Sequence, residues 1–447
     1  MNFDAVKDCL IAEANRAGLS EYEVFFMESS ERSTETLKDE ISSFSSGVGG
    51  GVCFRCVVNG HMGSASTELL TEEEMRALVS RAMEGATIIE NDDKAILFGG
   101  SEHYEAVENK NMFESDTARL KEIALKIQKE TYAQDGAVTD GTQSGVFSTE
   151  IRTVLMNSKG LQLSNRASIS GAYVQAVVGR DGVSQESFDF TVGFDEGELK
   201  DLSEHTVRDA LSKLGATEVE SGKYDILIDG KQMKALLSSY CSVFSAKNAQ
   251  KGLSLLKGKE GELIASPILS LVDDPMREDC PMKTPFDGEG VATYRKSVIE
   301  NGVLTTLLYD LATADRAGVA STGNGQRASY AESVGISPYS FYFTPGTLSK
   351  EELLASVEDG IYVTGFKGLH AGCNAVTGDF SIESDGYRVR DGRIAEAIKS
   401  FTIAGNFFDL LKQIEAVGDT VKFGLPSGFT VFGSPDVLVR SMSVGGK

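Results

Sequence analysis

The sequence is poor in the residue that most catalytic metal sites and most catalytic triads require. It contains four histidines, separated by tens of residues, at His61, His103, His205 and His370. Zinc enzymes and serine-protease-like triads use roughly one to three histidines at a single site. The sequence also contains no HExxH pair, no GxSxG nucleophile turn and no phosphate-binding GxxxxGK[ST] loop. These absences argue against a catalytic metal site or a triad within this chain.

Cysteines and long apolar runs are also scarce. The six cysteines are scattered along 447 residues, at Cys9, Cys53, Cys56, Cys241, Cys280 and Cys373, and a chain of this length does not need disulfides to stabilise its fold. Cys53 and Cys56 form a CxxC pair in a β-rich run, where residues three apart point to opposite faces. We expect a reduced structural pair, with a redox or metal function as the alternative.

No run of eighteen apolar residues predicts a membrane span. The N-terminal stretch MNFDAVKDCLIAEANRAG lacks the apolar core of a signal peptide. These two features favour a cytoplasmic protein with no membrane partner.

Positive charge is in deficit. Lysine and arginine number 43 against 66 aspartates and glutamates, a net charge of −23. Binding to a nucleic-acid backbone depends on cationic contacts, so we expect no direct nucleic-acid partner. One short stretch, at residues 247–259, carries Lys247, Lys251, Lys257 and Lys259. A solvated loop is the preferred interpretation of this stretch, and an anionic partner is the alternative.

The length of 447 residues suggests two or three domains. The first half alternates helical and strand patterns. Helical patterns cover residues 4–17, a segment that starts at a Thr71–Glu74 capping box, residues 115–131 and residues 201–214. β patterns cover residues 22–28, 34–46 and 51–58, a strand near Met62, and a meander over 136–195 with a turn at 157–160. The polar, glycine-flanked stretch 215–222 then suggests a division into domains 1–216 and 217–447.

The second half is dominated by β runs separated by glycine turns. It opens with a strand at 224–228 and a helix whose Met233, Leu236, Leu237 and Tyr240 lie on one face. A second capping box, Ser349 to Glu352, starts one more helix. We therefore expect an α+β fold with a mixed N-terminal domain and a β-rich C-terminal domain.

Two loops carry residue types that chemistry uses. The loop GLHAGCNAVTGDFS brings His370, Cys373 and Asp379 into one glycine-rich segment. Such a trio can bind a metal or act on an acyl group, but a tight glycine-dependent turn is the preferred interpretation. Asp287-Gly288-Glu289 resembles a calcium loop only superficially, because the remaining ligand positions are not acidic.

Five segments of the second half resemble the TldD/PmbA family, in the order in which the family carries them. They are Ala265-Ser-Pro267 with Val272-Asp-Asp274, the segment TPFDGEGVATYRKSVIENGVLTTLLYD at 284–310, the segment NAVTGDFS at 374–381, the segment FTIAGN at 401–406, and the stretch from Gly433-Ser-Pro435 to Gly446. The first half agrees with the family in its layout, but its motifs match those of the family less closely. We therefore identify the chain as similar to the PmbA branch, also called TldE and often described as a modulator of DNA gyrase.

The resemblance implies a fold and an assembly. It implies an α+β N-terminal domain and a C-terminal domain built on a curled, barrel-like β-sheet. In the paired system, TldD and TldE form a heterodimeric zinc protease that trims or degrades peptides. TldD carries the metal on a helix with HExxxH and a late cysteine, where two imidazoles and a thiolate hold zinc and the glutamate polarises the attacking water.

This sequence departs from that pattern at each ligand. The HExxxH positions fall on Asp229, Gly230 and Lys234, and the late cysteine falls near Phe423-Gly424. Gly230 cannot act as a base, and Lys234 places a cation where the metal would be. The resemblance therefore implies a member that lacks the metal ligands.

These observations together predict a PmbA/TldE-like subunit of a cytosolic TldD/TldE-type zinc metalloprotease complex. We expect no catalytic residue, no metal ligand and no cofactor in this chain, and zinc only in the TldD-type partner. The other expected partner is a peptide or an unfolded protein, and a homodimer of the isolated chain is compatible with this prediction. Glycine-rich edges of the C-terminal strands are expected to capture extended peptide by strand addition. The residues predicted to line the peptide chamber are His370, Cys373, Asn374, Thr377, Gly378, Asp379, Phe380 and Ser381.

Two alternatives remain at this stage. One is an autonomous peptidase with a cryptic site at His370, Cys373 and Asp379. The other is a non-proteolytic binding protein that modulates DNA gyrase or its inhibitors.

Overall fold

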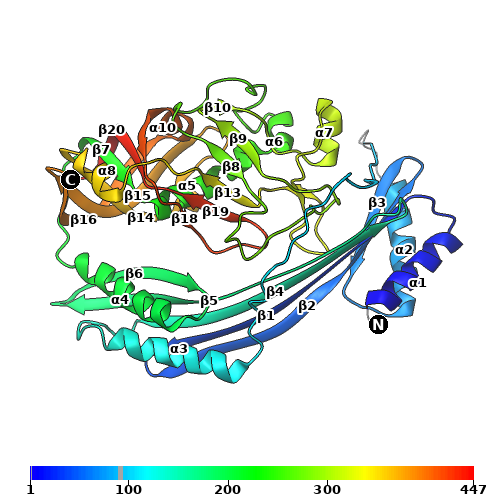
Figure 1. The fold of residues 1–447 in the computed structure, drawn as a ribbon, viewed down its shortest axis with the longest axis horizontal. Coiled ribbons are helices and arrows are strands. Elements are labelled where there is room, and N and C mark those ends of the chain that lie inside the picture. The colour runs from blue at the N-terminus through cyan, green and yellow to red at the C-terminus, as the bar shows by residue number, and fades with distance from the viewer. Residues whose placement is uncertain (2, 89–93) are drawn as a thin grey trace.

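The computed structural model describes residue 1, residues 3–88 and residues 94–447. In this part of the chain, the strands form three six-stranded sheets and one two-stranded ladder. One sheet belongs to the N-terminal half, and the others belong to the C-terminal half (Figure 1). The α+β prediction with a β-rich C-terminal half is confirmed.

A long antiparallel meander forms the N-terminal sheet, with strand order β3-β2-β1-β4-β5-β6. Its strands are β1 (Tyr22–Leu37), β2 (Glu40–Val58), β3 (His61–Thr67), β4 (Gln143–Asn157), β5 (Gln162–Arg180) and β6 (Val183–Val192). The predicted turn at 157–160 joins β4 to β5 and is confirmed, with Gly160 N donating to Asn157 O at 3.2 Å. The single strand expected over 34–46 is wrong. It contains a two-residue hairpin turn between Leu37 and Glu40. Lys38 adopts the left-handed conformation there (φ 56°), and no glycine marks the turn in the sequence.

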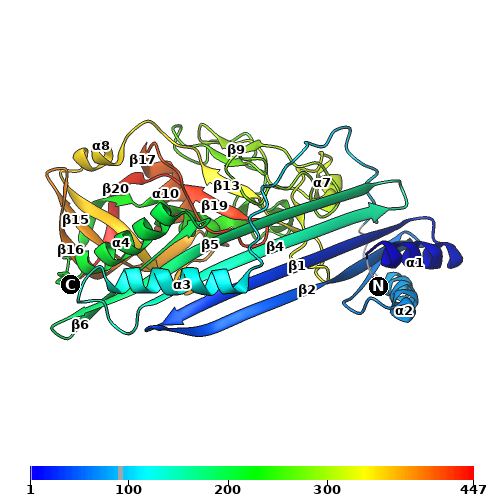
Figure 2. The ribbon, with the colours of Figure 1, turned by 60° about the horizontal axis from the view of Figure 1, so that its bottom comes forward.

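Two pairs of helices pack on this sheet. Helices α1 (Phe3–Arg16) and α2 (Glu72–Thr87) lie at one end, and α3 (Thr117–Tyr132) and α4 (Glu196–Ser212) lie toward the other (Figure 2). Helix α4 begins five residues before the predicted start, because the Asp195 side chain accepts from the backbone of Gly197 and Glu198 and caps it. The capping box at α2 is only half formed. Thr71 accepts from Glu74 N at 3.3 Å, but the Glu74 carboxylate pairs with Arg81 instead of the Thr71 backbone.

The CxxC pair lies inside the N-terminal sheet. Cys53 and Cys56 are both buried and unbonded, and they belong to two different hydrophobic clusters. The prediction of opposite faces is therefore confirmed.

A closed sheet forms the centre of the C-terminal half. Its strand order is β16-β15-β14-β7-β20-β17, and an additional pairing of β16 with β20 closes it. The strands are β7 (Gly222–Ile228), β14 (Asp359–Lys367), β15 (Asp379–Arg390), β16 (Arg393–Asn406), β17 (Ile414–Val417) and β20 (Val437–Gly445). Closure removes strand edges. The expectation of free edges for peptide capture is therefore wrong for β7, β14, β15 and β20, whereas β16 is covered by β20 only at Thr402–Ala404.

The other C-terminal strands are short. The second sheet has the order β10-β9-β8-β13-β19-β18, and β11 pairs with β12. These strands are β8 (Leu271–Asp273), β9 (Lys296–Glu300), β10 (Val303–Leu304), β11 (Gly325–Gln326), β12 (Gly335–Ile336), β13 (Ser340–Phe343), β18 (Lys422–Phe423) and β19 (Val431–Ser434).

Helix α5 (Gly230–Tyr240) lies in the main C-terminal core. The predicted face of Met233, Leu236, Leu237 and Tyr240 is fully buried there. The remaining helices are η1 (Cys241–Phe244), α6 (Ala246–Gln250), α7 (Leu311–Ala317), α8 (Lys350–Ala355), α9 (Leu369–Gly372) and α10 (Phe407–Gln413). The capping box predicted at Ser349 and Glu352 is present at α8. Among the described residues, none of the helices combines the length and the hydropathy needed to span a membrane.

A buried ion cluster joins the N-terminal sheet to the C-terminal half. Glu23 of β1 accepts from Arg55 Nε of β2 at 2.9 Å and from Arg327, which reaches in from the C-terminal half. The side chains of Glu23 and Arg327 are each 1% exposed. Removal of Glu23 would leave two buried guanidinium groups without their shared carboxylate, so the cluster fixes the two halves against each other.

Candidate functional site

The positions that correspond to the zinc-binding helix lie where β7 runs into α5. Asp229 is the N-cap of α5, and its carboxylate accepts from Lys231 N at 2.8 Å. Gly230 is the first residue of the helix, and Lys234 lies just over one turn further on. The sequence forms this junction because an apolar strand ends at an aspartate that caps a helix with a buried apolar face.

Donors from the protein itself already bind the Asp229 carboxylate. It accepts from Lys422 Nζ at 2.7 Å and from the Tyr362 hydroxyl. Burial alone would raise the pKa of Asp229, but the Lys422 ammonium and the Tyr362 hydroxyl outweigh it and hold that pKa below its ordinary value. The same ammonium bonds Asp436 Oδ1 at 2.7 Å, and this oxygen also accepts from Gly230 N at 2.7 Å. Lys422 therefore joins two buried carboxylates at the start of α5.

Gly230 has no space for a side chain. A Cβ at this position would overlap the carbonyl oxygen of Ser434 and lie 3.1 Å from the carbonyl carbon of Pro435. Both obstacles are backbone atoms, so a side chain here requires the chain itself to move. With the backbone of this chain as it stands, a glutamate cannot be placed at Gly230 to polarise water.

Lys234 and Gly424 lie beside each other. A Cβ at residue 424 would lie 2.9 Å from Lys234 Nζ. The structure therefore brings together the helix position and the late-chain position that the resemblance assigns to metal ligands. Burial, followed by the neighbouring Lys231 charge, lowers the pKa of Lys234.

These residues do not fit a zinc ion. Tetrahedral protein sites use thiolate, imidazole and carboxylate ligands, whereas an amine and a glycine stand at two of the positions and the Asp229 carboxylate is paired. Within the described part of the chain, no group of three or more His, Cys, Asp or Glu side chains is arranged to hold a metal ion.

The predicted chamber loop lies at the other end of α5. The Tyr240 hydroxyl, in the last turn of that helix, donates to Asp379 O at 2.7 Å, and the Tyr240 ring stacks on Phe407 with centroids 4.4 Å apart. The structure therefore does not bring the chamber candidates together with Asp229 and Lys234. It does pair two family-like segments, because Asp379 of β15 lies opposite Asn406 of β16.

The His370, Cys373 and Asp379 side chains do not form a nucleophile and its base. His370 is exposed, and it forms no hydrogen bond or ion pair with the other residues that the structure describes. Burial raises the pKa of the Cys373 thiol, which opposes formation of a nucleophilic thiolate. The Asp379 carboxylate accepts from Asn406 Nδ2 at 3.0 Å, and this contact, with Thr377, lowers its pKa.

The loop itself is a tight turn with a polar surface. Asn374 Oδ1 accepts from the backbone of Val376 at 3.0 Å and of Thr377 at 3.3 Å. Gly378 has φ of 84°, and a Cβ there would lie 2.7 Å from the Phe408 ring. Of the candidates, Gly378 and Phe380 are buried and Cys373 is half-buried; His370, Asn374, Thr377, Asp379 and Ser381 are exposed.

Comparison with known proteins agrees with the motifs and with the fold. Family models match three stretches of the chain: PmbA/TldA metallopeptidase domain 1 at residues 22–86, the central domain at 111–214 and the C-terminal domain at 221–446. This chain belongs to the PmbA/TldA metallopeptidase family. The two-domain division at 216/217 stays a prediction, since the N-terminal sheet runs through both of the first two matched regions.

Relatives within the PmbA/TldA family include proteins of both branches. A metalloprotease of Methanocaldococcus jannaschii is 27% identical over 416 residues, covering 89% of each chain. The metalloprotease PmbA homologue of Haemophilus influenzae is 24% identical over 373 residues, covering 80% of this chain and 79% of the relative. The metalloprotease TldD homologue of the same organism is 28% identical over 255 residues, covering 55% of this chain and 53% of the relative.

Solved structures share the whole fold. A Thermotoga maritima protein described as a modulator of DNA gyrase superposes with a TM-score of 0.88 at 29% identity, covering 99% of this chain and all of the other. TldE from Thermococcus kodakarensis superposes with a TM-score of 0.89 at 22% identity and the same coverage.

Sequence reasoning missed three residues of the site in this PmbA/TldA-family chain. Tyr362, Lys422 and Asp436 surround Asp229, but they come from strands or turns far from α5 in the sequence. The only available signals were indirect. Lys422 directly precedes the Phe423-Gly424 position, and Asp436 directly follows the Ser434-Pro435 segment.

The Asp287–Gly290 loop is held by its own carboxylates. Asp287 accepts from the backbone of Glu289 and Val291 through Oδ1 and from Gly325 N through Oδ2, each at 2.9 Å. Burial, with the neighbouring Glu289 charge, raises the pKa of Asp287 to about 8. Protein donors thus use the oxygens that a cation would need, which agrees with the superficial nature of the calcium-loop likeness.

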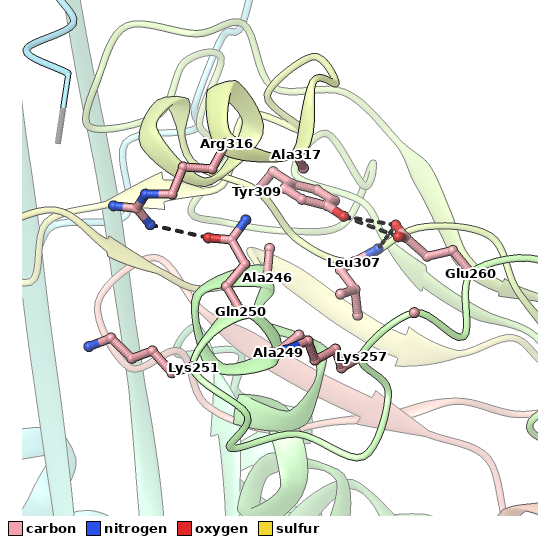
Figure 3. Close-up of a pocket in the computed structure, with 11 residues that line it drawn as sticks. Ala246, Ala249, Gln250, Lys251, Lys257, Glu260, Leu307, Tyr309, Arg316 and Ala317 are labelled. Carbon is pink, nitrogen blue, oxygen red and sulfur yellow. Dashed lines mark hydrogen bonds between the residues drawn. The ribbon is translucent and has the colours of Figure 1, made fainter. Parts of the chain in front are cut away.

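The basic stretch lines an open pocket between α6 and α7 (Figure 3). Its volume is about 420 Å³, and its lining includes Lys251, Lys257 and Arg316 together with the apolar Leu307 and Ala249. Arg316 Nη1 donates to Gln250 Oε1 at 3.1 Å, and Glu260 accepts from the Tyr309 hydroxyl at 3.1 Å. Lys251 and Lys257 are exposed, in agreement with the solvated-loop interpretation of this stretch. Lys247 departs from it, because it is half-buried and belongs to α6.

Proposed function

We propose that this chain is a PmbA/TldE-like, non-catalytic subunit of a cytosolic TldD/TldE-type zinc metalloprotease complex that processes or degrades peptides. The observation that carries the proposal is the contact of Lys234 with Gly424. It places an amine and a glycine together at the point where the family resemblance expects an imidazole and a thiolate.

The surroundings of Lys234 support the same conclusion. A metallopeptidase needs a bound metal with an open position and a general base beside it. Here Asp229 is neutralised by Lys422, and Gly230 is enclosed by the Ser434 and Pro435 backbone. On this proposal zinc belongs to the TldD-type partner, and this chain contributes surface rather than chemistry.

We assign the exposed part of the 370–381 loop to the wall of the peptide chamber. His370, Asn374, Thr377, Asp379 and Ser381 present polar groups to solvent on a rigid turn. A surface of that kind can contact many peptide sequences without selecting one, as a processing chamber for unfolded peptide requires.

The test is a reconstitution. The purified chain is mixed with the TldD-type relative from the same source, and complex mass and peptide hydrolysis are measured. A stable complex with hydrolysis above that of the relative alone is expected. If no complex forms and hydrolysis is unchanged, the proposal fails.

A matched pair of variants tests the chamber wall. Thr377→Arg is expected to lower hydrolysis by the complex, because a long cation would project into the chamber. Thr347→Arg, at an exposed threonine of the loop before α8, is the control and should leave hydrolysis unchanged. Equal activity of both complexes would remove the 370–381 loop from the chamber.

A role in modulating DNA gyrase or its inhibitors remains the second candidate, because the Thermotoga maritima relative carries that description. A pull-down of gyrase at low and high salt decides it. Absence of binding at low salt would reject a direct contact.

A further inference from the structure

One face of the N-terminal sheet packs against the C-terminal half and continues past the contact. On this face Ile169 of β5 belongs to a hydrophobic cluster with Met282 and Val431 of the C-terminal half. Alternate residues of a strand share a face, so Tyr173 lies on the same face as Ile169, further along β5. Helices α3 and α4 pack on the opposite face, and Figure 1 shows α3 below the sheet and the C-terminal half above it.

A row of residues crosses this face from β1 to β6. Glu35 of β1 lies opposite Gly145 of β4. Gly145 in turn lies opposite Tyr173 of β5, which lies opposite Phe190 of β6. A Cβ at residue 145 would lie 2.5 Å from Cζ of Tyr173, so the glycine lets the tyrosine ring lie across the sheet. The Tyr173 hydroxyl thereby reaches Glu35 Oε1, to which it donates at 2.9 Å.

Phe188 of β6 enlarges the aromatic surface. Its ring centroid lies 5.8 Å from that of Tyr173, with 33° between the ring planes. Phe188 is 55% exposed, and Tyr173 and Phe190 are half-buried. Neighbouring apolar groups left exposed in this way mark a contact surface rather than a core. We call Glu35, Tyr173, Phe188 and Phe190 the acid–aromatic shelf.

The negative charge of Glu35 is not neutralised by the protein. Its carboxylate oxygens accept from two neutral hydroxyls, that of Tyr173 and that of Ser43 at 3.2 Å. In the part of the chain that the structure describes, no lysine or arginine forms an ion pair with Glu35 or with Glu31. Glu31 is exposed on the same face of β1. The shelf therefore combines exposed rings with carboxylates that lack a cation.

We propose that the acid–aromatic shelf binds an extended peptide segment that carries lysine or arginine between apolar residues. This inference rests on the proposed function and names the class of peptide that the chamber accepts. A cation over the face of a tyrosine or phenylalanine ring is attracted by that ring. The Glu35 carboxylate beside the Tyr173 ring supplies a charged acceptor to the same cation, and apolar neighbours of the cation pack on Phe188.

Charge favours this class of peptide over an acidic or uncharged one. The net charge of −23 attracts cationic segments. The hairpin beside the shelf adds the exposed Asp39 and Glu40, whereas its one lysine, Lys38, lies 3.6 Å from Asp140. An acidic peptide meets repulsion on this surface, and an uncharged one covers Glu35 without giving it a partner, which costs free energy.

The shelf also adjoins the start of α5. Asp189, which stands between Phe188 and Phe190 in β6, accepts from Lys231 Nζ at 2.7 Å. Lys231 is the second residue of α5. A peptide on the shelf therefore lies beside the helix whose start corresponds to the metal-binding helix of the TldD branch.

Fluorescence anisotropy on the purified chain tests the class of peptide. The probe is a labelled peptide with the core Leu-Lys-Leu-Arg-Leu in a glycine–serine frame, and the reference peptide has glutamine at both cationic positions. We expect the cationic probe to bind more tightly, by an amount that falls as salt is added. Equal affinity of the two peptides would overturn the proposal.

Two matched pairs of variants separate the shelf from long-range attraction. Glu35→Gln keeps an acceptor for the Tyr173 hydroxyl and should raise the Kd of the cationic probe about threefold. Glu204→Gln removes the same charge from an exposed site on α4, across the sheet, and is its control. Phe188→Ala should raise the Kd about fivefold, and Val183→Ala, at a 49% exposed valine of the same strand, is its control. Equal effects within either pair would overturn the proposal.

The binding assay and the reconstitution fail independently. If the complex hydrolyses peptides while the shelf variants bind the cationic probe as the wild type does, the shelf is rejected and the proposed function stands. If the wild type binds the probe through the shelf but forms no complex with the TldD-type relative, the proposed function is rejected and the shelf stands as a peptide-binding surface.

Discussion

Lys422 is the residue that most changes the chemistry of the site. Its ammonium lies 2.7 Å from carboxylate oxygens of Asp229 and Asp436, whose side chains are 12% and 6% exposed. A fixed protein cation therefore neutralises two carboxylates at the start of α5. Burial alone would lower the pKa of Lys422, but the two carboxylates raise it, so the side chain stays charged.

Replacement of this cation tests its structural role. Lys422→Met should lower the free energy of unfolding by about 2 kcal/mol, because it leaves two buried carboxylates unpaired. Lys412→Met, at an exposed lysine of α10, should change it by less than about 0.5 kcal/mol. Urea unfolding of the three proteins measures both values. Equal stability of Lys422→Met and the wild type would show that the ion bridge is dispensable.

Asp287 makes a contribution to the stability of the fold that depends on pH. Burial and Glu289 raise its pKa from 3.8 to about 8. The folded chain then keeps a proton that the unfolded chain releases, so this contribution is complete below about pH 4 and is lost as the pH rises through about 8.

The Asp287→Asn variant isolates this contribution. Between pH 6 and pH 9, the unfolding free energy of the wild type should fall by about 3 kcal/mol relative to that of Asp287→Asn. Asp201→Asn, at an exposed aspartate of α4, should keep the wild-type profile. Parallel profiles for wild type and Asp287→Asn would contradict the raised pKa.

At the scale of single elements, α5 shows what the sequence predicts well. The spacing of Met233, Leu236, Leu237 and Tyr240 predicts both the helix and its buried face, because period and burial arise from the same local pattern. The hairpin between β1 and β2 and the early start of α4 could not be predicted in this way. Lys38 carries no turn signal, and the first turn of α4 contains only Glu196, Gly197 and Glu198 before its first apolar residue.

The packing at the start of α5 also limits which substitutions the chain tolerates at Gly230. Gly230→Ala should destabilise the chain by about 1–3 kcal/mol, because its Cβ would displace the Ser434 and Pro435 backbone. Gly136→Ala, where a Cβ meets no atom within 4 Å, is the control and should be neutral or slightly stabilising. Thermal or urea unfolding separates the two, and a neutral Gly230→Ala would show that the position tolerates a side chain.

For the whole molecule, family and fold class could be predicted from the sequence, but the contacts of the site could not. Lys234 and Gly424 are 190 positions apart by their residue numbers, and only the closed C-terminal fold places them together. The network of Asp229, Lys422 and Asp436 is likewise non-local. The pairing of β16 with β20 covers only Thr402–Ala404 of β16, and the N-terminal sheet has a further open edge at β2, which the sequence did not indicate.

The central claim is that this chain lacks a zinc site of its own and depends on a TldD-type partner for chemistry. Its most direct test is the zinc content of the purified chain, loaded with zinc, dialysed and measured by plasma mass spectrometry, beside the reconstituted complex. We expect far less than one zinc per chain for this protein alone and about one zinc per pair in the complex. One tightly held zinc per chain in the protein alone would contradict it.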